Sequence, residues 1–329
     1  MKFKYFNRFV YFTGILTILN YSKDLSKQLK MMWMSTFKTD QLSSLHDKYG
    51  NGWVIVTGGT SGIGLSFAHQ LSKVGYNICI ISKDQEKIGK TCLDLERTYG
   101  VKTKNINFNF SECLDENSVN LLKKKVEDSL GNEDVSILIN NVGLQYDSDF
   151  FFNSLKPQEI ISYVSVNILS QMIMYHLFLE KMQKQNRRSL IIDVASSTTM
   201  TNALPNYIVY QSTKTFNARF SDLIKRQLHV NAVLDNIENK VDISLFNPGL
   251  TLTNLSERHR NKTFLSETSD NVVAAGLSDI VNGNLVTSGA FKHKTTNFIM
   301  KFLPDYFKLN YFGPNVVKTF DNLRKKSDN

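Results

Sequence analysis

The chain has 329 residues, 42% of them hydrophobic and only five of them proline, so it can bury a sizeable core and holds no long proline-rich linker. Its formal net charge of +9 favours anionic partners, but no zinc finger or RNA-recognition signature accompanies that charge, and we expect no nucleic-acid binding. The three cysteines (Cys79, Cys92, Cys113) form no CxxC pair and the six histidines are scattered, which predicts a reducing environment and no metal site.

The first 49 residues are predicted to form a hydrophobic leader followed by a connecting helix. The run from Phe9 to Leu19 is uncharged and mostly apolar, and as a helix rising ~1.5 Å per residue it would reach across about half of a ~30 Å hydrocarbon core. Basic residues precede the run, and no convincing small-residue cleavage site follows it. We interpret it as a membrane anchor; the alternative is an amphipathic or disordered leader.

From residue 53 onward, short apolar runs alternate with helical stretches. Strands are predicted at 53–56, 77–81, 103–110, 135–140, 189–196 and 241–247, and helices near 62–74, 84–99, 115–130, 157–184 and 208–230. This alternation predicts an α/β fold, a doubly wound parallel sheet of the Rossmann type with helices on both faces. We divide the chain into the leader (1–49), the Rossmann-type domain (50–290) and a C-terminal extension (291–329) whose aromatic residues and lysines suit a membrane surface or a cover over the substrate.

A glycine-rich turn, TGGTSGIG, follows the first predicted strand at 57–64. A tight turn, a close approach of backbone to a pyrophosphate and free N–H groups at the start of a helix all favour Gly58, Gly62 and Gly64 at these positions. Because the turn stands between a strand and a helix, it predicts a dinucleotide site that includes Ser61 and Ile63. The alternative is an ordinary glycine-rich turn.

The second predicted strand ends in Ser82 and Lys83. An NAD site of this fold has an acidic residue at this point, whereas a hydroxyl and an ammonium suit a 2′-phosphate, so the sequence favours NADP(H) over NAD(H). Asp84 stands one residue later and would favour NAD(H) if the register differed by one.

Further motifs extend the pattern, and together they resemble the short-chain dehydrogenase/reductase family over about residues 50–255. NNVG at 140–143 matches the family's NNAG, and YQSTK at 210–214 matches its YxxxK. Segments such as YGNGWVIVTGGTSGIG, ILINNVG and YQSTKTF are most similar to the very-long-chain 3-oxoacyl-CoA reductase and 17β-hydroxysteroid dehydrogenase branch. The resemblance implies catalytic roles for Asn167, Ser197, Tyr210 and Lys214. It implies cofactor contacts from Gly58, Ser61, Gly62, Ile63, Gly64, Ser82, Lys83, Asn109, Asn140, Val142, Gly143, Tyr210, Lys214, Pro248, Gly249 and Thr253.

The implied catalytic residues divide the work of carbonyl reduction. Tyr210 is expected to give its phenolic proton to the carbonyl oxygen, and Lys214, on the same helix face, to lower a phenol pKa that is ordinarily ~10. The family places its serine thirteen residues before the tyrosine, which selects Ser197 over Ser196 as the group that polarises the carbonyl. Asn167 is expected to hold a water that connects Lys214 to solvent; the alternative is a buried amide bonded to helix backbone.

Two positions depart from the family. Asn109 stands where relatives carry an aspartate that contacts adenine, so we expect weaker cofactor binding. Asp193 stands where an asparagine is common before the serine.

The resemblance implies an NADP(H)-dependent reductase of a lipophilic ketone, with long-chain 3-oxoacyl-CoA in fatty acid elongation as the leading substrate and a hydroxysteroid or other lipid alcohol as the alternative. A non-catalytic nucleotide-binding scaffold is a further alternative, which the complete set of catalytic residues disfavours. The resemblance also implies a homo-oligomer at the endoplasmic reticulum membrane, with the catalytic domain in the cytosol.

Overall fold

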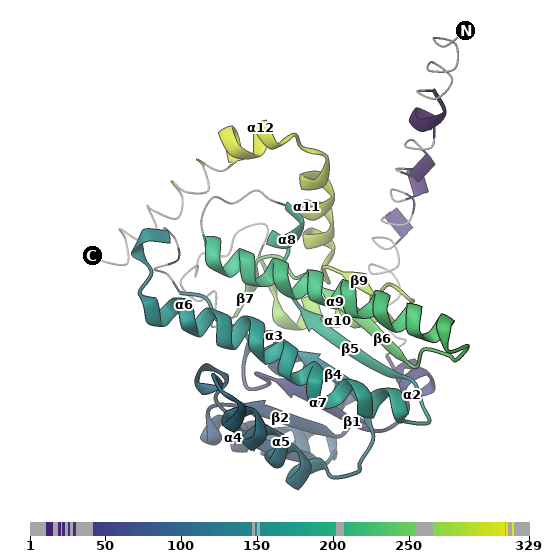
Figure 1. The fold of residues 1–329 in the computed structure, drawn as a ribbon, viewed down its shortest axis with the longest axis vertical. Coiled ribbons are helices and arrows are strands. Elements are labelled where there is room, and N and C mark those ends of the chain that lie inside the picture. The colour runs from purple at the N-terminus through teal and green to yellow at the C-terminus, as the bar shows by residue number, and fades with distance from the viewer. Residues whose placement is uncertain are drawn as a thin grey trace.

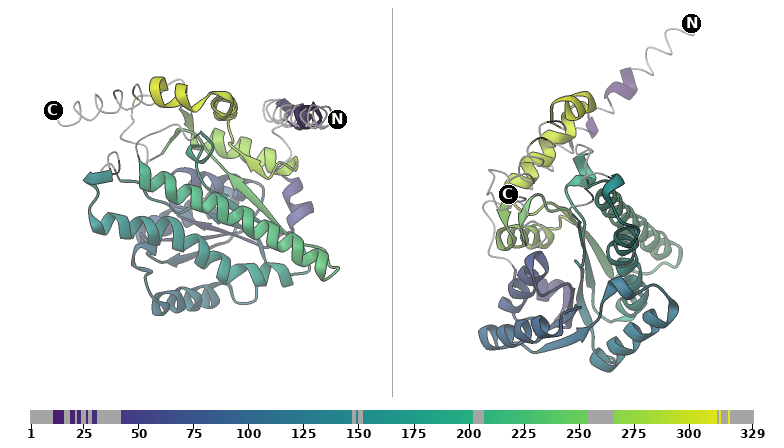
Figure 2. Two further views of the ribbon diagram at one scale, coloured as in Figure 1. Left: turned by 45° about the horizontal axis from the view of Figure 1, so that its top comes forward. Right: turned by 90° about the vertical axis from the view of Figure 1, so that its left-hand side faces the viewer.

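The computed structural model describes residues 11–15, 19–20, 22–23, 26, 29–30, 42–146, 149, 152–201, 207–253, 266–312, 314 and 318. Part of the predicted leader from Phe9 to Leu19 and the whole segment 254–265 lie outside these residues. The described parts of 11–30 are helical, and they project from the body of the protein on the same side as the C-terminal helices (Figure 1, Figure 2).

A seven-stranded parallel sheet forms the centre of the protein, in the order β3-β2-β1-β4-β5-β6-β9 (Figure 1). Its strands are β1 (Trp53–Thr57), β2 (Ile78–Ser82), β3 (Thr103–Asn107), β4 (Val135–Asn140), β5 (Ser189–Val194), β6 (Val241–Phe246) and β9 (Val286–Thr287). The chain order reverses between β1 and β4, and sheets of this kind bind ligands at the carboxyl ends of the strands beside that reversal. The predicted Rossmann-type fold is confirmed.

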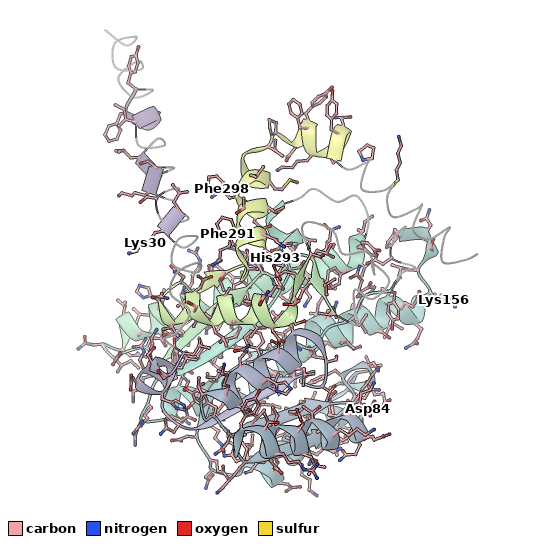
Figure 3. All side chains as sticks on the ribbon, turned by 180° about the vertical axis from the view of Figure 1, so that it is seen from behind. Lys30, Asp84, Lys156, Phe291, His293 and Phe298 are labelled. Atoms are coloured by element: carbon pink, nitrogen blue, oxygen red, sulfur yellow. The ribbon has the colours of Figure 1, made fainter. Side chains whose placement is uncertain are left out.

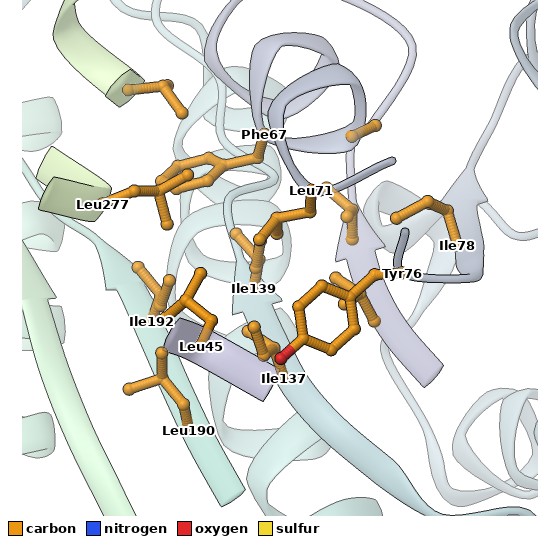
Figure 4. Packing of buried hydrophobic residues seen from close by; sticks show 14 of the residues in the cluster. Leu45, Phe67, Leu71, Tyr76, Ile78, Ile137, Ile139, Leu190, Ile192 and Leu277 are labelled. Carbon is orange, nitrogen blue, oxygen red and sulfur yellow. The ribbon is translucent and has the colours of Figure 1, made fainter. Parts of the chain in front are cut away.

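Helices cover both faces of the sheet (Figure 2). One face carries α3 (Gly62–Lys73), α4 (Gln85–Tyr99) and α10 (Ser269–Val281), and the other carries α5 (Glu116–Leu130), α7 (Ser170–Lys184) and α9 (Ile208–Leu234). Because successive strand side chains point to opposite faces, Ile137 and Ile139 of β4 pack in one core with Phe67 and Leu71 of α3, whereas Leu138 packs in the other (Figure 4). Burial on both faces explains why β1, β2 and β4 are mostly apolar, whereas the edge strand β3 (TKNIN) is mostly polar.

The predicted helix near 157–184 is interrupted in the structure. It consists of α6 (Pro157–Tyr163), a π-helical turn η4 (Val164–Leu169) and α7. Among the described residues, this run alone is long and apolar enough to cross a membrane, but half of its most apolar stretch is buried, and α7 packs in the core. It is therefore a core helix. The π turn carries Asn167, and such turns frequently occur at functional sites.

The remaining elements are short or lie at the C-terminus: α2 (Ser44–Tyr49), η1 (Phe110–Glu112), η3 (Phe152–Ser154), α8 (Thr198–Thr201), β7 (Thr251–Leu252), β8 (Glu267–Thr268), α11 (Phe291–Phe302), α12 (Asp305–Phe307) and η6 (Lys308–Phe312). Helix α11 belongs to the predicted C-terminal extension. Its Lys294 forms an ion pair with Asp279 of α10, and both side chains are buried. The start of the extension is therefore fastened to the sheet domain.

Candidate active site

The turn between β1 and α3 leaves space that only glycine permits. Gly58 and Gly62 adopt positive φ angles of +66° and +54°. A Cβ atom on Gly64 would lie 2.4 Å from the carbonyl oxygen of Gly58 and 2.4 Å from Nδ2 of Asn141. Since backbone cannot yield at such a distance, any side chain at Gly64 would displace the turn.

The first turn of α3 is open to a ligand. Its N-cap residue, Ser61, forms no side-chain hydrogen bond to the helix, and no acidic residue stands in the first turn. Ile63 packs against the core formed by α3, α4 and α10. Free N–H groups and the positive end of a helix dipole bind anions, so this turn fits the pyrophosphate of a dinucleotide.

Asn141, which the sequence did not lead us to select, holds the glycine turn in place. Its Nδ2 donates to the carbonyl oxygens of Thr57 (2.9 Å) and Gly58 (3.2 Å), and its backbone N–H donates to Thr57 Oγ1 (2.9 Å). The side chain of Asn140, which we did select, instead donates from Nδ2 to Asp193 Oδ1 at 2.8 Å. Neighbouring residues at a strand end point in opposite directions, and that alternation was the available signal for Asn141.

The next two residues of NNVG join the cofactor side of the site to the catalytic side. The Val142 N–H donates to Thr57 Oγ1 at 3.0 Å. A Cβ atom on Gly143 would lie 3.3 Å from Lys214 Nζ and 3.6 Å from Asn167 Oδ1. The absence of a side chain at Gly143 therefore lets these two polar groups approach the motif closely.

At the end of β2, the residues expected to select the cofactor differ in the contacts that they make. Ser82 Oγ lies 3.3 Å from Thr60 Oγ1 beside the glycine turn, and Lys83 is exposed. Asp84 is the N-cap of α4: its carboxylate accepts the Lys87 N–H at 3.1 Å and pairs with Lys87 Nζ at 3.3 Å, and these contacts lower its pKa (Figure 3). Its carboxylate is thus occupied by its own helix.

Asn109 is likewise engaged locally. Its Oδ1 accepts hydrogen bonds from Ser111 N–H (3.2 Å) and Ser111 Oγ (2.8 Å), and its Nδ2 donates to Glu112 Oε1 (2.6 Å). It caps the turn η1, and its expected contact with adenine stays a prediction.

The structure brings Tyr210 and Lys214 together on one face of α9. Lys214 Nζ lies 6.0 Å from the centre of the Tyr210 ring and donates to the carbonyl oxygen of Val194 at 2.8 Å. The Ser196 hydroxyl accepts hydrogen bonds from the Thr198 N–H (3.3 Å) and Thr198 Oγ1 (3.0 Å), and it acts to lower the pKa of Tyr210. Ser197 is tied through its backbone, since its N–H donates to the carbonyl oxygen of Pro248 at 2.9 Å.

Burial shifts the pKa values of Tyr210 and Lys214. It raises the pKa of Tyr210 to about 12, while the hydrogen bond from Ser196 acts in the opposite direction. It lowers the pKa of Lys214 to about 8, while the negative charge of Asp193 acts to raise it. Desolvation disfavours the charged form of each group, so nearby partners decide how much charge remains at the site.

Asn167 is completely buried, and its amide holds a loop. Its Oδ1 accepts the Leu144 N–H (2.8 Å), and its Nδ2 donates to the Leu144 carbonyl oxygen (3.0 Å) and to Thr213 Oγ1 (3.0 Å). These bonds fix the chain that leaves NNVG against α9. The expected water relay through Asn167 stays a prediction.

Behind Lys214, Asp193 forms the centre of a buried polar network. Its carboxylate accepts hydrogen bonds from Asn140 Nδ2 (2.8 Å), Tyr175 Oη (2.6 Å) and Ser221 Oγ (2.6 Å). Burial raises the pKa of Asp193, and these donors act in the opposite direction. Three donors satisfy a carboxylate that would otherwise be costly to bury.

The loop after β6 closes the cofactor side. The Gly249 N–H donates to His293 Nδ1 at 3.1 Å, and His293 Nε2 lies 3.2 Å from the Leu250 carbonyl oxygen (Figure 3). Thr253 reaches the glycine turn, because a Cβ atom on Gly62 would lie 3.0 Å from Thr253 Cγ2. His293 comes from α11, forty-four residues after Gly249, and no motif in the sequence indicates its contact with this loop.

Comparison with known proteins agrees with this geometry. The family described as short chain dehydrogenase matches residues 52–263. The chain is 30% identical to a zebrafish (Danio rerio) very-long-chain 3-oxoacyl-CoA reductase-A over 76% of its own length and 73% of the relative. It is 26% identical to human 17-beta-hydroxysteroid dehydrogenase type 3 over 77% of this chain and 75% of that protein.

One human relative is named as an inactive protein. The chain is 30% identical to inactive hydroxysteroid dehydrogenase-like protein 1, over 54% of this chain and 52% of that protein. Several other curated relatives are also matched over only about half of their length. Among solved structures, a 7beta-hydroxysteroid dehydrogenase has the same fold, with a TM-score of 0.65 at 18% identity over 81% of this chain and 98% of that one.

Proposed function

Because the chain belongs to the short-chain dehydrogenase family, we propose that it reduces a ketone on a lipophilic substrate to a secondary alcohol with NADP(H). One observation carries the proposal: Tyr210, Lys214 and Ser196 come together beside an open anion-binding turn. A proton donor, a positive charge and a hydrogen-bond donor are the groups that carbonyl reduction requires.

Each of these residues has a distinct role. A bound nicotinamide supplies the hydride, which adds to the carbonyl carbon. Tyr210 gives its phenolic proton to the carbonyl oxygen, which completes the alcohol. Lys214, as an ammonium, stabilises the phenolate that remains. The Ser196 hydroxyl donates a hydrogen bond to the same carbonyl oxygen and stabilises its developing negative charge.

The adjacent serines offer a matched test of these roles. We propose Ser196 for the carbonyl-polarising role because it acts on the pKa of Tyr210, whereas the family spacing selects Ser197. Ser196→Ala should lower kcat on the order of 10²-fold, since the loss of one oxyanion donor costs that much. Ser197→Ala should change kcat less than threefold, because the hydrogen bond from Ser197 to Pro248 comes from its backbone N–H and survives the substitution. The opposite ranking of the two variants would return the role to Ser197.

The preference for NADP(H) is supported by the end of β2. Ser82 and the exposed Lys83 offer a hydroxyl and a cation to a 2′-phosphate, while the carboxylate of Asp84 is engaged with Lys87. An acceptor for the ribose hydroxyls of NAD(H) would have to come from Asp84, which would first have to leave its helix.

The leading substrate is a long-chain 3-oxoacyl-CoA, as the name of the zebrafish relative suggests. The alternative is a 17-keto steroid, as the human relative suggests. Exposed apolar side chains lie on η3, on α6 and η4, which pack against α9, and on the start of α9 itself, and they suit either lipophilic molecule: Phe152, Ile160, Ile161, Val164 and Ile208.

A single assay separates these substrates. Membranes that contain the full-length protein are given NADPH with either 3-oxoacyl-CoA or 17-keto steroid, and NADPH oxidation is measured by absorbance. We expect oxidation with the acyl-CoA; oxidation with the steroid alone would contradict the elongation role. Measurable NADPH binding without oxidation of either substrate would instead favour a non-catalytic scaffold, the class suggested by the inactive relative.

We also propose that the protein attaches to the endoplasmic reticulum membrane with its catalytic domain in the cytosol. Exposed apolar residues lie on the projecting N-terminal helical segments and on the C-terminal helices, on the same side of the protein: Tyr11, Phe12, Ile15, Tyr306, Phe307, Leu309 and Tyr311 (Figure 1). Aromatic and basic residues favour the membrane interface. Flotation with vesicles of endoplasmic reticulum lipids should carry the full chain upward, and a chain that stays at the bottom would contradict the attachment.

A homo-oligomer is supported by the outer face of α9. Phe216, Leu223 and Val230 recur every seven residues on this helix and are exposed. Such a stripe is typical of helix pairing. Light scattering of the detergent-solubilised protein should give at least a dimer mass, and Leu223→Asp should reduce it to the monomer.

A further inference from the structure

The N-terminus of the catalytic helix α9 lacks a cap from its own sequence. Its N-cap residue is Tyr207, which has a φ of +55° and forms no side-chain cap. The first N–H groups of any helix have no partner within the helix. In α9 these groups lie directly before and at the proposed proton donor, Tyr210, so whatever binds them also bears on the active site.

A carboxylate from a distant part of the chain binds these N–H groups. Asp149, sixty residues before Val209, accepts the Val209 N–H at Oδ1 (3.1 Å) and the Tyr210 N–H at Oδ2 (2.8 Å). Its backbone carbonyl oxygen accepts the N–H of Tyr207 at 2.9 Å. Asp149 is completely buried. Asp149 therefore binds three N–H groups at the start of α9, those of Tyr207, Val209 and Tyr210.

A second residue secures Asp149 from the opposite side. The hydroxyl of Tyr163, on α6, accepts the Tyr146 N–H at 2.7 Å and acts to lower the pKa of Asp149. Burial raises the pKa of Asp149, and its hydrogen bonds act in the opposite direction. The two backbone donors, one on each oxygen of the buried carboxylate, stabilise its charged form and fix its position.

The segment that carries Asp149 leads directly from the cofactor motif. It begins after Gly143, where Asn167 bonds both backbone groups of Leu144. It ends at Asp149, which bonds the first turn of α9. The segment thus connects the NNVG motif of the cofactor side with the residue that donates the proton.

We propose that Asp149 is a positioning residue that fixes the backbone of Tyr210 relative to the cofactor side of the site. Its hydrogen bonds join it to Tyr207, Val209 and Tyr210, and not to the glycine turn. Its removal should therefore change how well Tyr210 is aligned, and not whether the cofactor binds. The kinetic part of this proposal rests on the proposed reductase function.

The test compares two aspartates that both cap helices. Asp115 caps α5, where it accepts the Ser118 N–H at 2.8 Å, far from Tyr210 along the chain and exposed. Asp149→Ala should lower kcat on the order of 10²-fold, because a misplacement of about 1 Å costs that much. Asp149→Asn keeps one acceptor oxygen and should recover on the order of tenfold of that loss. Asp115→Ala should leave kcat within twofold of the parent, and all three variants should bind NADPH within twofold.

A second measurement does not depend on turnover. Hydrogen exchange of the Val209 and Tyr210 amides, followed by mass spectrometry without substrate, should accelerate at least tenfold in Asp149→Asn and stay unchanged in Asp115→Ala. Unchanged exchange in Asp149→Asn, or a kcat within twofold of the parent in Asp149→Ala, would overturn the proposal. If the parent protein oxidises no NADPH with any ketone, the proposed function fails while the exchange result still decides whether Asp149 fixes the helix.

Discussion

Two helix N-termini face the site, and the protein treats them in opposite ways. The first turn of α3 has glycines on either side of Ser61, no side-chain cap and no acidic residue, so its N–H groups stay available to a bound anion. The first turn of α9 has its N–H groups bound by the buried carboxylate of Asp149. The backbone donors are of the same kind in both helices. An open N-terminus provides a binding site, and a closed one provides a fixed platform for a reacting side chain.

The largest expected effect is a loss of kcat that comes from α9 alone. Tyr210→Phe removes the proton donor on α9 and leaves α3 untouched, so kcat should fall by about 10³-fold or more while NADPH binding stays within twofold. Turnover is measured by NADPH oxidation and binding by cofactor fluorescence.

Tyr306→Phe serves as the control, because this tyrosine is exposed on α12 and should leave both quantities unchanged. A Tyr210→Phe enzyme that keeps more than a tenth of the parent kcat would mean that another group donates the proton.

The complementary change disturbs the open N-terminus of α3. Gly64→Ala places a Cβ atom 2.4 Å from the Gly58 carbonyl oxygen, so the turn must shift and the dissociation constant for NADPH should rise at least about tenfold. Fluorescence titration measures the change.

Gly89→Ala on α4 is the matched control. Nothing lies within 4 Å of the added Cβ, so cofactor binding should not change and unfolding should become harder by about 0.5–1 kcal/mol. Equal loss of NADPH binding in both variants would show that α3 is not the anion site.

The contrast between the helices also explains what the sequence could predict. The glycine turn and the Tyr210–Lys214 pair are local patterns, in which residues a few positions apart share one task. The parallel sheet followed from alternating apolar runs for the same reason. These features need no knowledge of which distant segments meet.

The parts that the sequence did not reveal depend on distant contacts. Asn141 bonds Thr57 across eighty-four residues, His293 bonds Gly249 across forty-four, and Asp149 bonds Val209 across sixty. A single aspartate or histidine forms no periodic pattern in the sequence that would indicate such a distant partner. The choice between Ser196 and Ser197 also depends on distant contacts, because the backbone conformation after β5 decides which hydroxyl reaches α9, and the two alanine variants test it.

A smaller effect on cofactor affinity should show whether the end of β2 prefers NADPH to NADH. Lys83→Ala removes an exposed cation at the end of β2, so the dissociation constant for NADPH should rise about tenfold while that for NADH stays within twofold. The difference should shrink as salt is added, because exposed charges are screened.

Lys90→Ala on α4 is the control, since this exposed lysine pairs with Glu86 of its own helix at 2.6 Å. It should not change the ratio of the two dissociation constants. A parallel rise for NADH in Lys83→Ala would show that the lysine binds the pyrophosphate and not a 2′-phosphate.

The smallest expected effect comes from Asp193, whose charge lies behind Lys214, and not from Asp149 at the N-terminus of α9. Burial lowers the pKa of Lys214 to about 8, and Asp193 acts to raise it, so the ammonium is present below about pH 8 and is lost as the pH rises through that value. Asp193→Asn keeps the shape of the side chain and removes its negative charge, so the pKa of Lys214 should fall further, and the alkaline decline of kcat should begin at a lower pH. The pH profile of kcat measures this shift, with Asp115→Asn as the control, because that exposed carboxylate caps α5 and should leave the profile unchanged. An alkaline limb that stays in place in Asp193→Asn would mean that Asp193 is already protonated in the native protein, and that the network of Asn140, Tyr175 and Ser221 holds a neutral acid.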